Sequence, residues 1–176
     1  EVRLLSNVDG SSFVSVFFAG PIRAAGGTAQ ALAVLIADMI RRELGIDPYK
    51  PTDPEVERVK EEFGLFRGNL QYRPSPAEIE EIVRACPIMI NGESTERIEC
   101  AGYGRVRNVD DTRIRGGVLL VIGEGMCLKA PKIQRHTERL KVPGWDFISK
   151  FAAKGKEKEN EGKGTLSLIH ISEPTR

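Results

Sequence analysis

The chain has 176 residues, with 26 lysines and arginines against 25 aspartates and glutamates, and 40% of its residues are apolar. A chain of this length can bury roughly 70% of the surface that it exposes when unfolded, so it needs no disulfide or metal to hold a core. Collagen-like, miniature and wholly disordered proteins are therefore excluded. No stretch approaches the roughly 20 apolar residues of a membrane-spanning helix, and we expect a cytoplasmic protein without membrane contact.

Three cysteines, Cys86, Cys100 and Cys127, are the candidates for a metal site or a disulfide. They form no Cys-x-x-Cys pair, and only His136 and His170 could join them as ligands. Structural zinc sites typically use closely spaced pairs of such ligands. We therefore expect three buried or half-buried free thiols and no metal ion.

The first predicted elements are a strand and a long helix. Residues 12–18 are rich in β-branched and aromatic side chains, which predicts a buried strand that stops at Gly20-Pro21. Apolar residues then recur at helical spacing over residues 29–44. Thr28 is a good N-cap for this helix, and Gly45 is placed just after its C-terminus.

Two shorter helices are predicted over residues 53–63 and 76–85. Each begins with a Ser/Thr-x-x-Glu capping box, in which Thr52 and Ser75 are the N-caps, and each has a proline in its first turn. Acidic side chains in a first turn are favourable beside the positive end of the helix dipole. We therefore interpret these charges as solvated helix faces rather than as catalytic acids.

The second half of the chain opens with a predicted hairpin. An apolar run at 88–90 meets Asn91-Gly92, which is a strong two-residue hairpin signal, and a return strand is expected near residues 97–101. The next apolar run, 118–122, favours a strand when taken alone.

Apolar residues beyond 118–122 continue on one helical side as far as Leu140, so we predict a helix there, with Pro131 marking a kink or a restart. The resulting fold class is α+β, with short strands and a hairpin packed against several helices.

Two glycine-rich turns are candidate anion sites, because each combines arginine with Gly-Gly at a predicted helix start. Glycine lets the backbone approach a ligand closely, and the N–H groups of a helix N-terminus suit a phosphate. Arginine adds bidentate contacts to phosphate oxygens. A tight strand-to-helix turn explains the glycines equally well, so a structural role stays open. The candidates are Arg23, Gly26, Gly27 and Thr28 in the first turn and Arg113, Arg115, Gly116 and Gly117 in the second.

The first turn resembles a nucleotide-binding P-loop only in part. Gly27 stands where Gly-x4-Gly-Lys-Thr requires lysine, and the first glycine, Gly20, comes one place early. ATP hydrolysis is therefore disfavoured, which weakens the interpretation as a small nucleotide-binding enzyme.

Residues 105–141 carry nine lysines and arginines against four acidic residues, a net charge of +5 that suits a polyanion. On a helix, one basic stripe would be formed at three- or four-residue steps by Lys129, Lys132, Arg135 or His136, and Arg139. A merely solvated face explains this stripe about as well. Lys129, Lys132 and Arg135 complete the list of candidate phosphate contacts.

No catalytic constellation is visible in the sequence. His136 has no serine or cysteine near it in the chain to suggest a nucleophile pair. Asp110-Asp111 is a single carboxylate pair, whereas two-metal phosphoryl chemistry typically needs more acidic ligands. We therefore assign no catalytic residue and no metal ligand.

Several blocks together resemble the N-terminal part of the large subunit of the archaeal D-family DNA polymerase. The similarity covers roughly residues 1–155 in consistent order. The blocks are Phe18-Ala-Gly-Pro-Ile-Arg-Ala-Ala-Gly-Gly-Thr-Ala-Gln-Ala-Leu-Ala-Val-Leu35, Tyr49-Lys-Pro-Thr52, Leu70-Gln-Tyr-Arg-Pro-Ser-Pro76, Thr112-Arg-Ile-Arg-Gly-Gly-Val118, Ala130-Pro-Lys-Ile133 and Pro143-Gly-Trp-Asp146.

The resemblance implies a replicative polymerase made of a large catalytic subunit and a small 3′–5′ exonuclease subunit. It implies Mg²⁺ for nucleotidyl transfer by the parent protein, primer-template DNA as a partner, and a sliding clamp as a further candidate partner. The catalytic aspartates of that family lie in a barrel core much further along the subunit, so none is carried over here. The resemblance also implies a partly KH-like fold, although a Gly-x-x-Gly loop of that module is missing.

We expect residues 1–153 to form the α+β region of a longer protein and residues 154–164 to form a disordered, charged linker. Residues 165–176 resemble a translated sequencing adapter and are set aside as a non-native tail. Two functions remain open for the region. It either touches DNA phosphates beside the catalytic core, or it is a structural module whose acidic helices dock a partner subunit without touching DNA.

Overall fold

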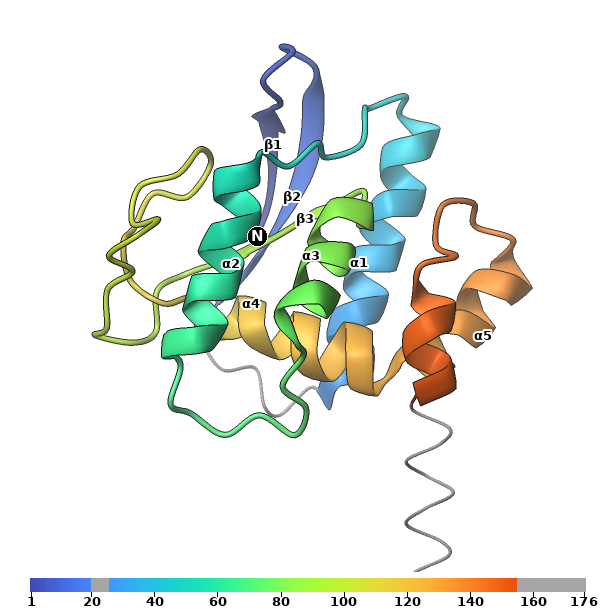
Figure 1. The fold of residues 1–176 in the computed structure, drawn as a ribbon. Coiled ribbons are helices and arrows are strands. Elements are labelled where there is room, and N and C mark those ends of the chain that lie inside the picture. Colours follow the sequence, from blue (N-terminus) through green and yellow to red (C-terminus); the bar gives the residue numbers. More distant parts are fainter. Residues whose placement is uncertain (20–25, 155–176) are drawn as a thin grey trace, which may run out of the picture.

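A three-stranded sheet lies behind a layer of helices (Figure 1) in the computed structural model, which describes residues 1–19 and 26–154. The strands are β1 (Val2–Ser6), β2 (Ser12–Phe18) and β3 (Met89–Gly92), in the order β1-β2-β3. β1 and β2 form an antiparallel hairpin in which Val2 faces Val16. β3 runs parallel to β2, with Met89 beside Ser15.

The predicted strand at 12–18 is confirmed as β2, the central and best-buried strand. Val14, Val16 and Phe18 belong to the main hydrophobic core, on the side covered by the helices. Phe13 belongs to a second, smaller cluster on the other side, where its ring centroid lies 4.8 Å from that of Tyr49. Because both faces of β2 are covered, its sequence is apolar at nearly every position.

The three predicted helices of the first half are confirmed as α1 (Gly26–Glu43), α2 (Asp53–Leu65) and α3 (Pro76–Ala85). The Glu78 side chain accepts the Ser75 amide at 2.9 Å, as expected for a capping box. Thr28 is not the N-cap of α1, because the helix already begins at Gly26. Gly20 and Pro21, where the strand is predicted to stop, lie outside the described residues, and so does the tail beyond 154.

The predicted hairpin at Asn91-Gly92 is wrong. Gly92 ends β3, and a Cβ atom on it would lie 2.6 Å from the Phe18 carbonyl oxygen, so the glycine permits the parallel pairing with β2. No return strand forms at 97–101, where the chain is an irregular loop that reaches residue 115 and carries only the isolated bridges Glu99–Arg113 and Val106–Val109. Long-range pairing therefore overrides the local turn signal.

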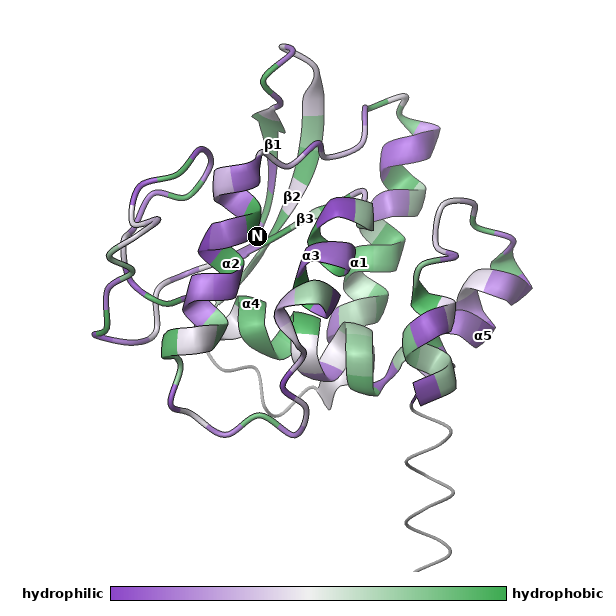
Figure 2. Ribbon diagram, in the orientation of Figure 1, coloured by the Kyte–Doolittle hydropathy of each residue, from purple (hydrophilic) through white to green (hydrophobic). Residues whose placement is uncertain are grey.

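The predicted helix after Gly117 is confirmed and forms the buried centre of the helical layer. It consists of α4 (Gly116–Leu120) followed directly by η1 (Val121–Leu128), which is a π-helix. Figure 2 shows this combined helix as largely hydrophobic. Pro131 lies in the first turn of α5 (Ala130–Leu140) and therefore marks a restart, and residues 148–154 are again helical.

Glycines let α1 and η1 touch through their main chains. A Cβ atom on Gly27 would lie 2.7 Å from the Glu124 carbonyl oxygen, and one on Gly125 would lie 3.1 Å from the Gly27 carbonyl oxygen. On the other side of η1, a Cβ atom on Gly123 would lie 2.7 Å from the Tyr72 carbonyl oxygen. The glycine pair therefore sets the distance between the two helices.

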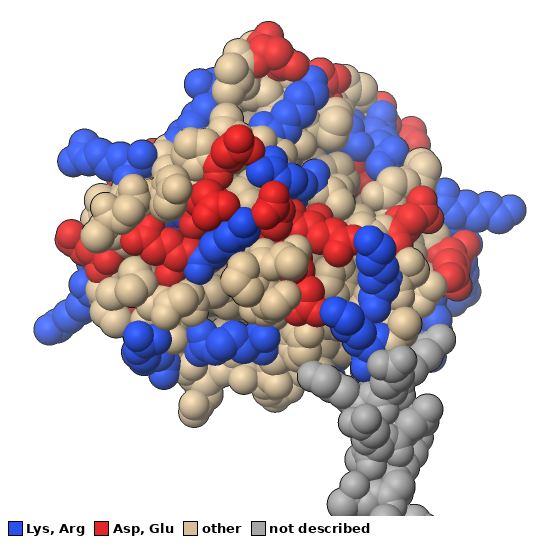
Figure 3. All heavy atoms as spheres, viewed as in Figure 1, with Lys and Arg blue, Asp and Glu red and all other residues tan. Residues whose placement is uncertain are grey.

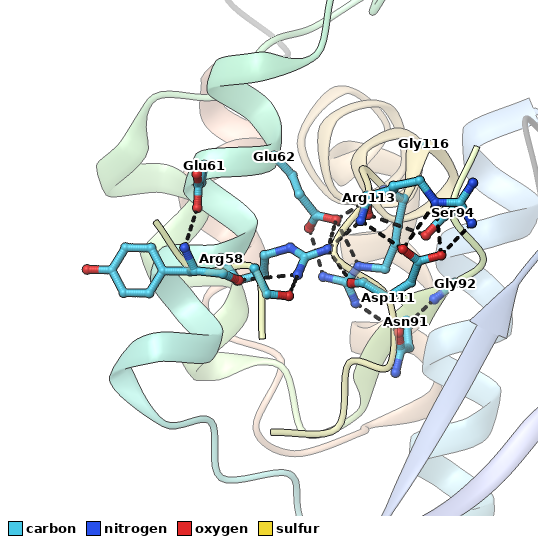
Figure 4. Close-up of polar contacts among 12 residues, drawn as sticks. Arg58, Glu61, Glu62, Asn91, Gly92, Ser94, Asp111, Arg113 and Gly116 are labelled. Carbon is cyan, nitrogen blue, oxygen red and sulfur yellow. Dashed lines mark hydrogen bonds and ion pairs between the residues drawn. The ribbon is translucent and has the colours of Figure 1, made fainter. Parts of the chain in front are cut away.

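A buried ion cluster fastens the loop 93–115 to α2. Glu62 has no exposed side-chain surface and accepts Nη2 of Arg115 at 2.8 Å and Nη2 of Arg58 at 3.4 Å (Figure 4). Arg58 also donates to main-chain carbonyls of the loop, including Gly104 at 2.8 Å and Arg113 at 2.9 Å. These bonds give the otherwise irregular loop a fixed conformation.

A second buried carboxylate, Asp38, fastens the C-terminal part of the chain to α1. Its Oδ2 accepts Nε1 of Trp145 and its Oδ1 accepts Nε of Arg41, both at 2.8 Å. Arg42 donates to Oδ2 of Asp38 at 2.9 Å and to the Pro143 carbonyl at 2.8 Å.

No helix within residues 1–19 and 26–154 is long and apolar enough to cross a membrane.

We expect Glu62→Gln to lower the free energy of unfolding by about 3–5 kcal/mol, because the change leaves two buried guanidinium groups without a counter-charge. Urea unfolding followed by circular dichroism measures the loss. The matched control is Glu57→Gln in the same helix, whose partner Lys60 forms a surface pair, and it should change stability by less than about 0.5 kcal/mol. Equal losses in both variants would contradict the assigned role of Glu62.

We expect Gly27→Val to destabilise the chain by about 1–3 kcal/mol, because the new side chain must push α1 away from η1. Gly64→Val is the control, since a Cβ atom on Gly64 of α2 meets nothing within 4 Å, and it should stay within about 0.5 kcal/mol. Thermal unfolding of both variants gives the comparison. Similar melting temperatures would show that the contact between the two helices tolerates side chains.

Candidate nucleic-acid interface

The first glycine turn is partly described, and it lies against η1. Arg23 is outside the described residues. Gly26 is exposed and has a φ of +71°, a conformation that favours glycine, and Thr28 is half-buried. Gly27 is buried by its contact with Glu124. The need for glycine at position 27 is therefore explained by helix packing, whereas Gly26 remains open to solvent.

The second glycine turn serves the interior of the protein. The Arg115 side chain is 2% exposed, and its Nε and Nη2 bond to Glu62 while Nη1 donates to Oδ1 of Asn91 at 2.8 Å. The Gly116 amide donates to Oγ1 of Thr95 at 2.9 Å, and Gly117 is buried. The prediction that this turn points a guanidinium and main-chain amides outward is wrong for Arg115 and Gly116, because both are already bonded inside the fold.

The positive charge of Arg115 is stabilised by the carboxylate of Glu62. Burial lowers the pKa of its guanidinium, but the facing Glu62 carboxylate outweighs this effect and raises the pKa overall. The group therefore stays protonated as an internal cation, and Glu62 is its counter-ion.

Arg113 is the exposed member of the second turn, and it lies beside a polar pocket of about 340 Å³ at the end of β3. Its Nη2 bonds to Oδ2 of Asp111 at 2.6 Å (Figure 4), and this hydrogen bond lowers the pKa of Asp111. Arg3 also lines the pocket, but so do Asp110 and Glu93. The lining holds three carboxylates against three arginines, and two of these arginines, Arg113 and Arg115, are already paired with Asp111 and Glu62. The pocket therefore offers no excess of positive charge and is a poor phosphate site.

Helix α5 presents the predicted basic stripe to solvent. Ala130, Ile133 and Thr137 are buried on its inner side, whereas Lys132, Arg135 and Arg139 are exposed on the other. Within the described part of the chain, none of these three cations forms an ion pair. On the face drawn in Figure 3, acidic and basic side chains are interspersed.

The start of the basic stripe lies next to the N-terminus of α1. The Glu124 carbonyl oxygen that packs against Gly27 also accepts the amide of Lys129 at 3.2 Å. The exposed start of α1 and the first cation of the stripe are thus brought together by η1. We define the α5 basic surface as Gly26, Thr28, Lys129, Lys132, Arg135 and Arg139.

The exposed cations Lys132, Arg135 and Arg139 form a row along α5. Residues 132–139 span about 10 Å at about 1.5 Å per residue. A row of separate cations of this length suits a polyanion better than a single small anion.

Sequence reasoning missed the buried charged residues Arg58, Glu62 and Asp38. A signal was present in α2, where Glu62 lies only about 60° around the helix from Val59, inside the apolar stripe. Charged residues at core-facing positions indicate internal ion pairs. Their distant partners could not be read from the sequence, because Arg115 is 53 positions away from Glu62 and Trp145 is 107 positions away from Asp38.

The three cysteines lie apart from one another as separate thiols. Cys86, Cys100 and Cys127 are free and buried, as expected, and burial raises the pKa of both Cys86 and Cys127 to about 12. Among residues 1–19 and 26–154, no group of three or more His, Cys, Asp or Glu side chains could hold a metal ion. Asp110 and Asp111 belong to no such group.

Comparison with known proteins identifies a family. The family model for "DNA polymerase II large subunit DP2, N-terminal" matches residues 1–154. The DNA polymerase II large subunit of Methanocella arvoryzae is 50% identical over 164 residues, covering 92% of this chain and 14% of the relative. That of Methanococcoides burtonii is 53% identical over 147 residues, covering 82% and 13%.

A third relative, the large subunit of Methanosarcina barkeri, is 46% identical over 171 residues, covering 94% of this chain and 15% of the relative. The chain thus spans about one seventh of the length of these relatives. The resemblance drawn from the sequence blocks is confirmed. The chain belongs to the family formed by the N-terminal region of the DNA polymerase II large subunit.

Proposed function

We propose that this chain is the N-terminal, non-catalytic part of a replicative DNA-directed DNA polymerase, and that its α5 basic surface binds DNA phosphates. Family membership supports the first part of the proposal. The observation that carries the second part is the row of exposed, unpaired cations Lys132, Arg135 and Arg139 within the described residues. Binding of such cations to phosphates releases condensed counterions, which makes the contact favourable at low salt.

Residues at the start of α1 extend this surface. Gly26 is open to solvent beside Lys129, and the first turn of α1 carries no acidic side chain that would repel an anion. Thr28 can donate its hydroxyl to a phosphate oxygen. Arg23 is kept as a candidate contact on sequence grounds alone. Arg113, Arg115, Gly116 and Gly117 are not part of the proposed surface.

The parent protein is proposed to extend a primer on a DNA template. Divalent Mg²⁺ ions would activate the 3′-hydroxyl and stabilise the leaving pyrophosphate, at aspartates outside this region. A small subunit with 3′–5′ exonuclease activity and a sliding clamp are proposed partners of the parent. In this proposal the described residues position DNA and support the catalytic core. They take part in no step of the chemistry.

The alternative is a structural module without DNA contact, and the placement of the glycines favours it. Gly27, Gly92, Gly116 and Gly125 all serve close main-chain or side-chain contacts inside the fold. Docking through the acidic helices α2 and α3 gains less support, because several of their carboxylates are already paired. Lys60 pairs with Glu57 and Glu80, and Arg84 pairs with Asp53 and Glu80.

We expect the triple change Lys132→Ala, Arg135→Ala and Arg139→Ala to weaken binding of the chain to primer-template DNA. Each lost phosphate contact should reduce the slope of log K against log salt by about 0.9 for duplex DNA, so the slope should fall by about 2.7. Fluorescence anisotropy over a salt series measures the slope. Circular dichroism verifies that the variant is folded.

The matched control removes the same charge elsewhere, through Arg67→Ala, Arg97→Ala and Arg105→Ala at exposed positions. It should leave the slope nearly unchanged if the α5 basic surface is the site. An equal loss in both variants would indicate a non-specific effect of net charge. Absence of binding by the unmodified chain at low salt would favour the structural alternative.

A further inference from the structure

An open apolar groove of about 440 Å³ lies between the C-terminal half of α1 and the turn that follows α5. Its walls come from two segments that are about a hundred residues apart in the chain. The lining includes Met39, Ile40, Leu44, Leu140, Val142 and Pro143. The groove is on the opposite end of α5 from Lys129 and is separate from the start of the α5 basic surface.

The outer face of α1 continues the groove as an apolar stripe. Ile36, Ile40 and Leu44 follow each other at four-residue steps and are 54%, 54% and 67% exposed. The inner face of the same helix, with Ala31, Val34 and Leu35, is already buried in the core. α1 is therefore apolar on two faces, and only one of them is covered by the described residues. Large contiguous apolar surface of this kind marks an interaction site.

The groove is held in shape by the Asp38 cluster. Arg42 joins its two walls, because it binds Asp38 within α1 and the Pro143 carbonyl across the groove at 2.8 Å. Trp145 fastens the same turn to Asp38. Because the groove is preformed, little conformational entropy is lost when it is filled. Burial of its apolar surface therefore contributes to affinity.

We propose that this groove receives an amphipathic helix from a later part of the same large-subunit polypeptide. The relatives are about seven times as long as this chain, so most of the polypeptide lies outside it. The stripe 36–44 spans about 12 Å, which matches two to three turns of helix. Glu43 and Lys141 both line the groove, and neither forms an ion pair within the described residues, so the incoming helix carries charged residues of both signs beside its apolar face.

The size of the groove favours an occupant from the same polypeptide over a second copy of the chain. A stable interface between separate proteins typically buries about 1,200–2,000 Å². A groove that takes only a few side chains falls short of that area. A segment of the same polypeptide can bind through a smaller buried area, because the linker keeps its effective concentration in the millimolar range.

The proposal rests on membership of the large-subunit family and does not require DNA contact. It is tested in a full-length large subunit, in which residues 1–154 of this chain replace the matching region of the Methanocella arvoryzae protein. The photo-crosslinker p-benzoylphenylalanine is introduced at Ile40, and mass spectrometry locates the crosslinked peptide. DNA binding by the α5 basic surface is measured separately, so either proposal can fail alone.

The expected result is a crosslink to one later segment of the same polypeptide, with a yield that does not depend on protein concentration. Leu140→Asp on the opposite wall should abolish the crosslink, whereas the matched change Leu4→Asp, at a residue 60% exposed on β1, should preserve it. Both changes should leave the melting temperature of the 176-residue chain within about 2 °C, because both side chains are at least half exposed.

Three results would overturn the proposal. A crosslink between two copies of the large subunit, whose yield rises with concentration, would assign the groove to self-association. A crosslink to a separate subunit or to DNA would assign it to that partner. Absence of any crosslink at Ile40 would show that the groove stays open to solvent in the full-length protein.

Discussion

The buried carboxylate of Glu62 is the interaction on which the rest of the fold depends. It neutralises one arginine from its own helix and one from the start of α4, and through Arg58 it fixes four carbonyl groups of the loop 93–115. Without this charge, two guanidinium groups would lie in an apolar interior without a counter-ion, at a cost that is a large part of the roughly 5–15 kcal/mol by which a domain is stable. The loop is irregular in backbone and yet fixed by electrostatics.

The same need for internal pairing explains why glycine next to arginine is ambiguous in a sequence. Glycine permits close approach, but the approaching group is either a ligand or another part of the chain. At Gly116 the group is the hydroxyl of Thr95, and at Gly27 it is the main chain of η1. Basic residues without local partners, such as those of α5, are the better guide to an external anion.

Local signals in the sequence predicted most helices, because capping boxes and apolar spacing act within a few residues. Ser75 with Glu78 and the proline at the start of α5 are examples. The partner of β3, the π-helix and strand β1 escaped prediction. The pairing of β3 with β2 joins residues more than 70 positions apart, and Gly92, which suggested a hairpin, is needed for that contact. The same holds for Arg115, whose burial depends on Glu62 in a distant helix.

Helix α5 is a single rod of 11 residues, about 16 Å long, with cations along its exposed side and an apolar wall at its far end. Rigid elements move as units. If α5 shifted against the core, where Ala130, Ile133 and Thr137 are buried, its basic side and the groove at its C-terminal end would move together. One helix thus joins the two proposed contact regions, the α5 basic surface and the groove beside Leu140.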